Sequence, residues 1–274
     1  MSEATWRLLN TGLNDGATNM AVDEAILLAV AEGRSPPTLR FYGWQPPCVS
    51  IGYAQSLRDE VDLDACRGHG YTWVRRPTGG RAVLHIDELT YSVTAAQEDP
   101  RVAGDIVTSY RRLSLGLVAG LRLLGCGAVQ AGRQPRGERD VAEARSAACF
   151  DVPSHHEVMA LGRKLVGSAQ VRRKGVVLQH GALPLMGDVS RLVDVLALDE
   201  PSRASLRAKL RWRAIALDEA LGGPVSFDQV AAALQEGFAR ALNLVLEPGE
   251  LSADEQADVV RLRAKYEGDD WTHG

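Results

Sequence analysis

The segment from Tyr71 to Ser92 constrains the fold most, because a basic glycine loop separates two short apolar runs. The runs Tyr71 to Val74 and Ala82 to Leu84 predict two strands, and the connection between them reads RRPTGGR. Paired glycines let backbone N–H groups approach a ligand closely, and arginines supply forked donors for a carboxylate or a phosphate. The loop therefore predicts either an anion cradle or a solvated hairpin turn, and a motif this short favours the turn.

Apolar periodicity and capping motifs predict the helices. Apolar residues at helical intervals indicate helices over residues 19–31 and 106–124, and a shorter helix over residues 59–66. Capping boxes indicate two further helices, from Ser226 to about Leu242 and from Ser252 to about Lys265. The C-terminal portion is therefore expected to be helical.

Apolar runs between turn residues predict the strands. Besides the two runs beside the glycine loop, the predicted strands are residues 5–9, 38–44, 48–53, 88–94, 128–130, 157–161, 164–171, 176–185 and an edge strand at 244–246. Residues 38–44 and 48–53 are expected to pair across Gln45-Pro46-Pro47. A two-residue turn at Gly162-Arg163 and a second turn at Arg172 to Gly175 make the later strands antiparallel.

The chain shows no composition break, internal repeat or low-complexity segment. We therefore predict one domain over residues 1–274, with its core over about residues 30–250. A chain of 274 residues can bury a large core without disulfides or metals. The predicted fold class is α+β, with a mixed, largely antiparallel sheet and packed helices.

Charge and cysteine usage exclude several classes of function. A formal charge of -4 argues against general affinity for nucleic acid. The four cysteines lack CxxC spacing, so neither a metal site nor a disulfide framework is expected. The start shows no secretion-signal pattern, and no apolar run reaches membrane-spanning length, so we expect a cytoplasmic protein. The acid-free window from Arg203 to Arg213 predicts either a docking surface for an acidic protein or a solvated helix face.

Cys149 is the cysteine best placed for chemistry, because it follows a polar stretch and lies at the start of a predicted strand, where it could be partly exposed. A thiol becomes a useful nucleophile when a nearby cation stabilises the thiolate, since the free pKa of about 8.5 leaves little thiolate at neutral pH. Lys164, on the following predicted hairpin, is the candidate cation, and a buried structural cysteine is the alternative. His155 and His156 are candidate bases, but adjacent histidines are expected to lie on a turn. The other three cysteines are expected to be packing residues.

Two segments resemble the signature pair of a known superfamily. RRPTGGRAVLH at residues 75–85 and KLVGSAQ at residues 164–170 resemble motifs of the lipoate-protein ligase A/B, octanoyltransferase and biotin-ligase superfamily. Within it, the chain is similar to octanoyltransferases of the type first recognised in Gram-positive bacteria, from Trp6-Arg7 to the C-terminal helices. The resemblance implies the lipoate/biotin ligase catalytic-domain fold, helices on one face of a mixed sheet, and an acyl channel near the glycine loop.

The resemblance also implies roles for individual residues. A family cysteine in an S-x-x-C-F-D context forms an acyl-thioester, which matches Cys149. The family lysine before G-S-A-Q, held to lower the pKa of that cysteine, matches Lys164. The substrate-binding residues implied in this way are Arg76, Thr78, Gly79, Gly80, His85, Gly167, Ser168 and Ala169.

The implied reaction moves octanoate from the phosphopantetheine of acyl carrier protein to a lysine of a lipoyl domain, such as that of glycine cleavage H protein. It would be the first step of endogenous protein lipoylation. No ATP or other cofactor is expected, because one thioester replaces another before the more stable amide forms. The alternatives are an ATP-dependent lipoate-protein ligase, an amidotransferase that moves octanoyl or lipoyl groups between lipoyl domains, and an acyl-binding module without turnover. Cys149 argues against the ligase, which needs no nucleophilic cysteine.

Overall fold

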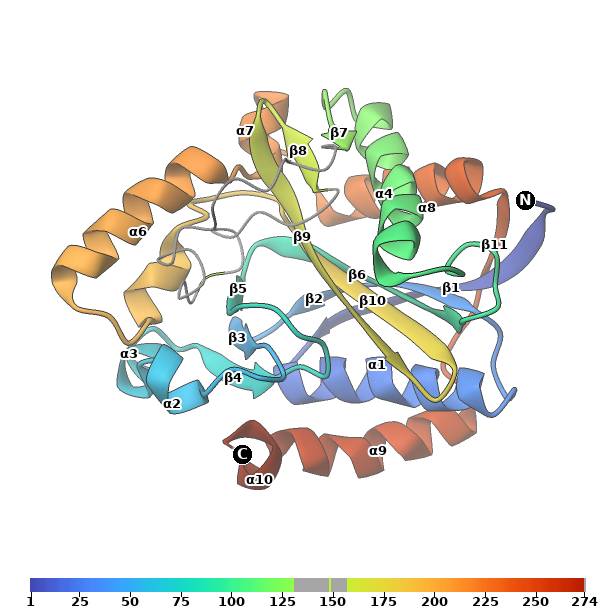
Figure 1. The fold of residues 1–274 in the computed structure, drawn as a ribbon, viewed down its shortest axis with the longest axis horizontal. Helices are drawn as coiled ribbons and strands as arrows, with labels where there is room; N and C mark the ends of the chain where they lie inside the picture. The colour runs from blue at the N-terminus through green and yellow to red at the C-terminus, as the bar shows by residue number, and fades with distance from the viewer. Residues whose placement is uncertain (131–147, 149–156, 274) are drawn as a thin grey trace.

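The structure is a computed structural model that describes residues 1–130, 148 and 157–273 (Figure 1). The strands are β1 (Ala4–Asn14), β2 (Thr38–Trp44), β3 (Cys48–Ile51), β4 (Thr72–Arg75), β5 (Val83–His85), β6 (Glu88–Ala96), β7 (Val129–Gln130), β8 (Val158–Ala160), β9 (Arg163–Arg173), β10 (Val176–Pro184) and β11 (Leu244–Pro248). The helices are α1 (Gly16–Ala31), α2 (Leu57–Glu60), α3 (Leu63–Gly68), α4 (Ile106–Leu123), the 3-10 helix η2 (Arg191–Val195), α6 (Glu200–Arg213), α7 (Leu217–Leu221), α8 (Phe227–Leu242), α9 (Ala253–Glu267) and α10 (Asp269–Thr272).

Most strands form one mixed sheet in the order β11-β1-β2-β6-β10-β9-β8-β7. β1 runs parallel to both β11 and β2, whereas the remaining neighbours are antiparallel. The turns between β8, β9 and β10 are too short for a crossover, so these strands return directly alongside one another. The predicted α+β class, with a mixed and largely antiparallel sheet, is confirmed, as is the edge position of β11.

Helices cover both faces of this sheet (Figure 1). α1 packs against β6 and β10 with α9 behind it, while α4 and α8 pack together on the opposite face. Alternate residues of β6 serve the two faces: Tyr91 joins the core cluster that contains Phe238, and Ser92 donates to Asp23 of α1 over 2.8 Å. The expectation of helices on one face is wrong. A strand covered on both sides shows no apolar alternation from which the second layer could be inferred.

A smaller sheet has the order β4-β3-β5. β3 lies between its neighbours, parallel to β4 and antiparallel to β5, so the glycine loop that connects β4 to β5 spans β3. The predicted hairpin across this loop is therefore wrong. The predicted pairing of β2 with β3 is also wrong, because Gln45-Pro46-Pro47 leads the chain from one sheet to the other.

Local motifs set most helix ends. Both capping boxes are present, at Ser226 and Ser252, as predicted. The helix predicted from residue 19 begins at Gly16, because the Asp15 side chain accepts from the Thr18 N–H. The helix predicted over residues 59–66 is divided into α2 and α3 by Val61, which forms a bridge with Leu196.

The turn between β8 and β9 lies one residue earlier than predicted. It consists of Leu161 and Gly162, whose φ angles are 49° and 76°. Two successive positive φ angles match the right-handed twist of a hairpin. Arg163, predicted as a turn residue, is the first residue of β9.

The basic window from Arg203 to Arg213 lies on α6, where the fold supplies the acids that the sequence window lacks. The ion pairs join Arg203 to Asp62 at 3.7 Å, Arg207 to Asp194 at 2.6 Å and Arg211 to Asp188 at 2.5 Å. These ion pairs with acids from other elements therefore offset much of the positive charge on the surface of α6. None of the helices within the described ranges combines the length and apolar character that a bilayer span requires.

Candidate active site

Residues from α1 and from both sheets line a pocket of about 370 Å³, here termed the inter-sheet pocket. Its lining residues are Met20, Tyr42, Trp44, Ser50, Arg76, Val83, His85, Thr90, Gly167, Ser168, Ala169, His180, Gly181 and Ala182. Arg76, His85, Gly167, Ser168 and Ala169 were predicted to bind substrate, and the fold brings these five together. Thr78, Gly79 and Gly80, which were also predicted to bind substrate, are not among the lining residues. Substrate binding by these eight residues stays a prediction.

The first hydrogen-bond chain behind this pocket runs from Arg76 to Glu88. Arg76 Nη1 donates to Ser50 Oγ over 3.1 Å, and Ser50 Oγ lies 2.7 Å from His85 Nε2. His85 Nδ1 lies 2.8 Å from Glu88 Oε1. Because Ser50 accepts from the arginine, its own proton points to Nε2, so His85 carries its proton on Nδ1 and donates to the carboxylate. The ring also stacks on Trp44, with centroids 3.9 Å apart.

A second chain of the same design runs from Arg76 to Asp23. Arg76 Nε donates to Thr78 Oγ1 over 3.2 Å, Thr78 Oγ1 lies 2.7 Å from His180 Nε2, and His180 Nδ1 lies 3.2 Å from Asp23 Oδ2. Burial lowers the pKa of His180 and nearby Arg76 acts in the same direction, although Asp23 opposes both. His180 is therefore neutral at neutral pH, with Nδ1 as donor and Nε2 as acceptor.

Asp23 is a fully buried carboxylate that four side chains hold in place. It accepts from Arg40 over 2.7 Å, Ser92 over 2.8 Å and Tyr42 over 3.0 Å, in addition to His180. Burial alone would raise its pKa, but the charge of Arg40 and the contacts with His180 outweigh burial and lower it. Asp23 therefore stays ionised beneath the inter-sheet pocket.

Arg76 joins the two chains to the glycine loop. Its remaining N–H groups donate to the backbone oxygens of Ser50 at 3.0 Å, Gly79 at 2.8 Å and Arg81 at 2.7 Å. Gly80 has a φ of 96°, a region that favours glycine, and a Cβ there would lie 2.9 Å from Arg76 Nη2. Arg76 thus holds the loop folded back on itself, and its predicted contact with substrate stays a prediction.

The loop is not an open anion cradle formed by three arginines. Arg75 is buried, and its guanidinium donates to backbone oxygens of Tyr53, Gln55, Trp271 and Thr272 over 2.6–3.1 Å. It therefore ties the small sheet to the C-terminal helices. The arginines of the loop suggested an anion site. The sequence does not show that folding brings backbone carbonyl groups to the Arg75 guanidinium, where they take the place of an anion.

Lys164 lies on β9, on the same strand as Gly167 and Ser168. Its Nζ is 2.8 Å from Glu157 Oε1, and both side chains are buried. Cys149, His155 and His156 lie outside the described residues. Ala148 is buried and forms a parallel bridge with Ala82, which directly precedes β5. The predicted proximity of Cys149 and Lys164 therefore stays a prediction.

The other three cysteines are buried and free, as predicted. Burial raises the pKa of Cys48 to about 12 and that of Cys66 to about 11, and it also raises the pKa of Cys126. A thiol with such a pKa carries almost no thiolate at neutral pH. These three cysteines therefore suit packing and not nucleophilic chemistry.

Residues 15–239 match the family described as lipoyl protein ligase A/B catalytic domain. The chain belongs to this family. A curated relative named Octanoyltransferase LipM, from Kyrpidia tusciae, is 50% identical over 98% of each chain. A bi-partite lipoate protein ligase from Thermoplasma acidophilum has a TM-score of 0.81 at 30% identity, covering 98% of this chain and 96% of that one. Lipoate-protein ligase A bound with ATP has a TM-score of 0.80 at 30% identity, covering 99% of each chain.

These similarities confirm the predicted lipoate ligase fold.

The site contains polar residues that the sequence analysis missed. Ser50, Glu88, His180 and Asp23 anchor the two hydrogen-bond chains. His180 could have been identified from the sequence, because it is a polar residue within the largely apolar predicted strand from Val176 to Leu185. A buried polar residue requires partners, so its position pointed to a network.

Proposed function

We propose that this protein is an octanoyl-[acyl carrier protein]:protein N-octanoyltransferase that acts through a thioester on Cys149. Full-length relatives at 50% and 48% identity carry the name Octanoyltransferase LipM, whereas the two ligases of known structure described above are 30% identical. The proposed donor is acyl carrier protein, and the proposed acceptor is the lysine of a lipoyl domain. The inter-sheet pocket is the proposed acyl site.

The chemical character of the inter-sheet pocket supports this assignment best. Ser50, Arg76, His85 and His180 line it, yet their polar atoms bond one another in the two chains. Met20, Trp44 and Val83 add carbon surface to the lining. A pocket whose polar atoms are already satisfied offers an apolar surface, which suits an uncharged alkyl chain.

The proposed reaction has two balanced steps. In the first, the Cys149 thiol loses its proton and attacks the octanoyl carbonyl carbon; a new C–S bond forms, the bond to the donor sulfur breaks, and that sulfur takes up a proton. In the second, the acceptor lysine amine attacks the enzyme thioester, an amide forms, and the amine proton returns to Cys149. The covalent intermediate lets two protein substrates use one site in turn.

Lys164 is the proposed positioning charge for Cys149. An ammonium near the thiol favours the thiolate by Coulombic attraction, and burial strengthens this attraction because water does not screen it. The pairing with Glu157 at 2.8 Å keeps the buried lysine charge compensated. We therefore assign Lys164 to thiolate stabilisation.

The function is tested by incubating the purified chain with octanoyl-acyl carrier protein without ATP. We expect intact mass to show one octanoyl group on the enzyme, located to Cys149 by peptide mapping and discharged when a lipoyl domain is added. Product that forms only with ATP and a free acid would establish the ligase instead. Faster acylation from an octanoylated lipoyl domain than from acyl carrier protein would establish the amidotransferase.

Gly52→Ala should impair acyl transfer although Gly52 lies outside the predicted motifs. A Cβ at this position would lie 2.1 Å from the Gly80 carbonyl oxygen, so the glycine loop must shift. Misplacement by about 1 Å costs on the order of 10²-fold in rate, and we expect a loss of that size in kcat/KM for self-acylation. Gly68→Ala is the matched control, because a Cβ there meets no atom within 4 Å. Equal rates for the two variants would contradict the role of the loop.

A further inference from the structure

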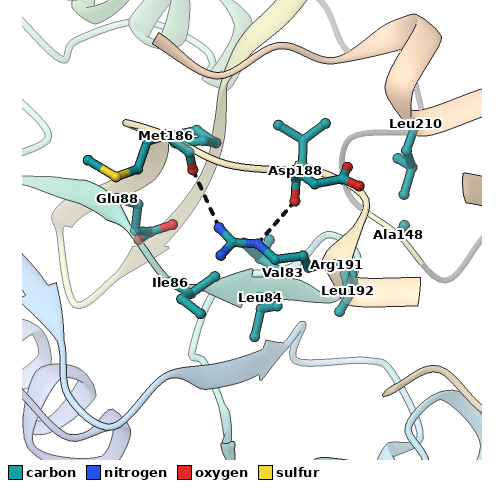
Figure 2. A pocket seen from close by; sticks show the side chains of 12 residues that line it. Val83, Leu84, Ile86, Glu88, Ala148, Met186, Asp188, Arg191, Leu192 and Leu210 are labelled. Atoms are coloured by element: carbon teal, nitrogen blue, oxygen red, sulfur yellow. Dashed lines mark hydrogen bonds between the residues drawn. The ribbon is translucent and has the colours of Figure 1, made fainter. Parts of the chain in front are cut away.

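A second pocket lies beside the inter-sheet pocket, and Figure 2 shows it from close by. β5, the segment after β10, η2 and α6 contribute its walls, and it is open to solvent on one side. The walls are mainly apolar, with Val83, Leu84 and Ile86 on one side and Leu192 and Leu210 on others. Apart from Val83, none of its lining residues lines the inter-sheet pocket.

The second pocket adjoins the inter-sheet pocket at two points. Val83 lines both pockets. Glu88 lines the second pocket and binds His85, which lines the inter-sheet pocket. Ala148 also lines the second pocket, and one peptide bond separates it in the chain from Cys149. The second pocket thus begins at the residue before the proposed nucleophile.

The shape of the second pocket suits a long ligand. In Figure 2, Ala148 and Leu210 lie at the opposite end from Met186 and Ile86. Arg191 lies between these ends, where Nε donates to the Asp188 carbonyl over 3.1 Å and Nη2 lies 3.4 Å from the Met186 carbonyl oxygen. The Asp188 carbonyl also accepts from the Arg191 backbone N–H over 3.2 Å, so both of its lone pairs are used. The Met186 carbonyl keeps a second lone pair, which can accept from an amide N–H of a ligand.

Thioester exchange needs space for two chains at one sulfur: the acyl chain and the arm that leaves. We propose that the second pocket binds the pantetheine arm of the acyl donor, an inference that rests on the proposed function. Such an arm alternates amide groups with methylenes, which matches apolar walls with a carbonyl acceptor.

The test compares two soluble donors, octanoyl-pantetheine and octanoyl-N-acetylcysteamine, which keeps only the end of the arm. We expect the wild type to prefer the full arm by about tenfold in kcat/KM for self-acylation, because remote contacts lower the barrier. Leu84→Trp, which fills the second pocket, should remove this preference by slowing the full-arm donor about tenfold, with the truncated donor changed less than about twofold. Leu123→Trp, at a half-exposed position on α4, is the matched control and should alter neither rate.

A second variant tests the same preference independently, in case Leu84→Trp does not fold. Met186→Trp changes a residue that is 43% exposed at the far end of the second pocket, and it should reduce the same preference. Equal use of both donors by the wild type, or equal slowing of both by the variants, would overturn the inference. If the variants slow only the transfer of the octanoyl group from the enzyme to a lipoyl domain, the second pocket binds the acceptor instead. Failure of every donor to acylate the wild type would instead remove the proposed function.

Discussion

Cys149→Ala should lower octanoyl transfer by at least about 10³-fold, because loss of a covalent nucleophile removes the intermediate on which both steps depend. The variant should also accumulate no octanoyl adduct. The measurement is ATP-free transfer from octanoyl-acyl carrier protein to a lipoyl domain, followed by intact mass of enzyme and acceptor. Transfer at the rate of the wild type would contradict the thioester mechanism.

Cys126→Ala is the matched control for this experiment. Cys126 is a free, buried cysteine that packs in the main core cluster, and burial raises the pKa of its thiol. Its replacement should reduce stability slightly and leave the octanoyl adduct in place. If the Cys126 variant lost the adduct while the Cys149 variant kept it, the nucleophile would have to be reassigned.

Asp23→Asn should reduce the free energy of unfolding by about 3–5 kcal/mol, the usual effect of removing one member of a buried ion pair. Asp23 and Arg40 are both 0% exposed and lie 2.7 Å apart. Without the carboxylate, the Arg40 guanidinium stays buried without its counter-charge. One of the two acceptor oxygens also becomes an NH2 donor, so either Ser92 or Tyr42 loses its acceptor. Urea unfolding followed by circular dichroism measures the change.

Asp258→Asn provides the comparison on the surface. Asp258 pairs with Arg261 and Arg34, whose side chains are 64% and 32% exposed. Such pairs contribute about 0–1 kcal/mol, so this variant should unfold near the wild-type midpoint. Equal destabilisation by the two substitutions would contradict the special role of the buried pair.

The same network predicts how stability depends on pH. The pKa of His180 is lowered from 6.5, chiefly by burial, so the unfolded chain binds a proton that the folded chain rejects. This contribution to stability is complete above about pH 6.5 and is lost as the pH falls below it. Asp23, whose pKa is lowered from 3.8, adds a loss only in stronger acid. His180→Gln should therefore flatten the stability profile just below about pH 6.5.

Much of the secondary structure was predictable because its causes are local. The capping boxes at Ser226 and Ser252 each need residues within one helical turn, and both formed where predicted. The meander of β8, β9 and β10 followed from its short turns. Strand pairing across longer distances was less predictable: β3 inserts between β4 and β5, and apolar content alone does not specify a neighbour.

The sequence by itself determined the family, the α+β class and the candidate residues Cys149 and Lys164, because these depend on motifs that are contiguous along the chain. Only the tertiary structure decided what the glycine loop does. Thr78 meets His180 across 102 residues, and His180 meets Asp23 across 157. A hydrogen bond needs its partners within about 3 Å, and such proximity between distant residues arises only when both sheets and α1 pack together. The loop that looked like an anion cradle therefore forms, through Arg76, one wall of an apolar pocket.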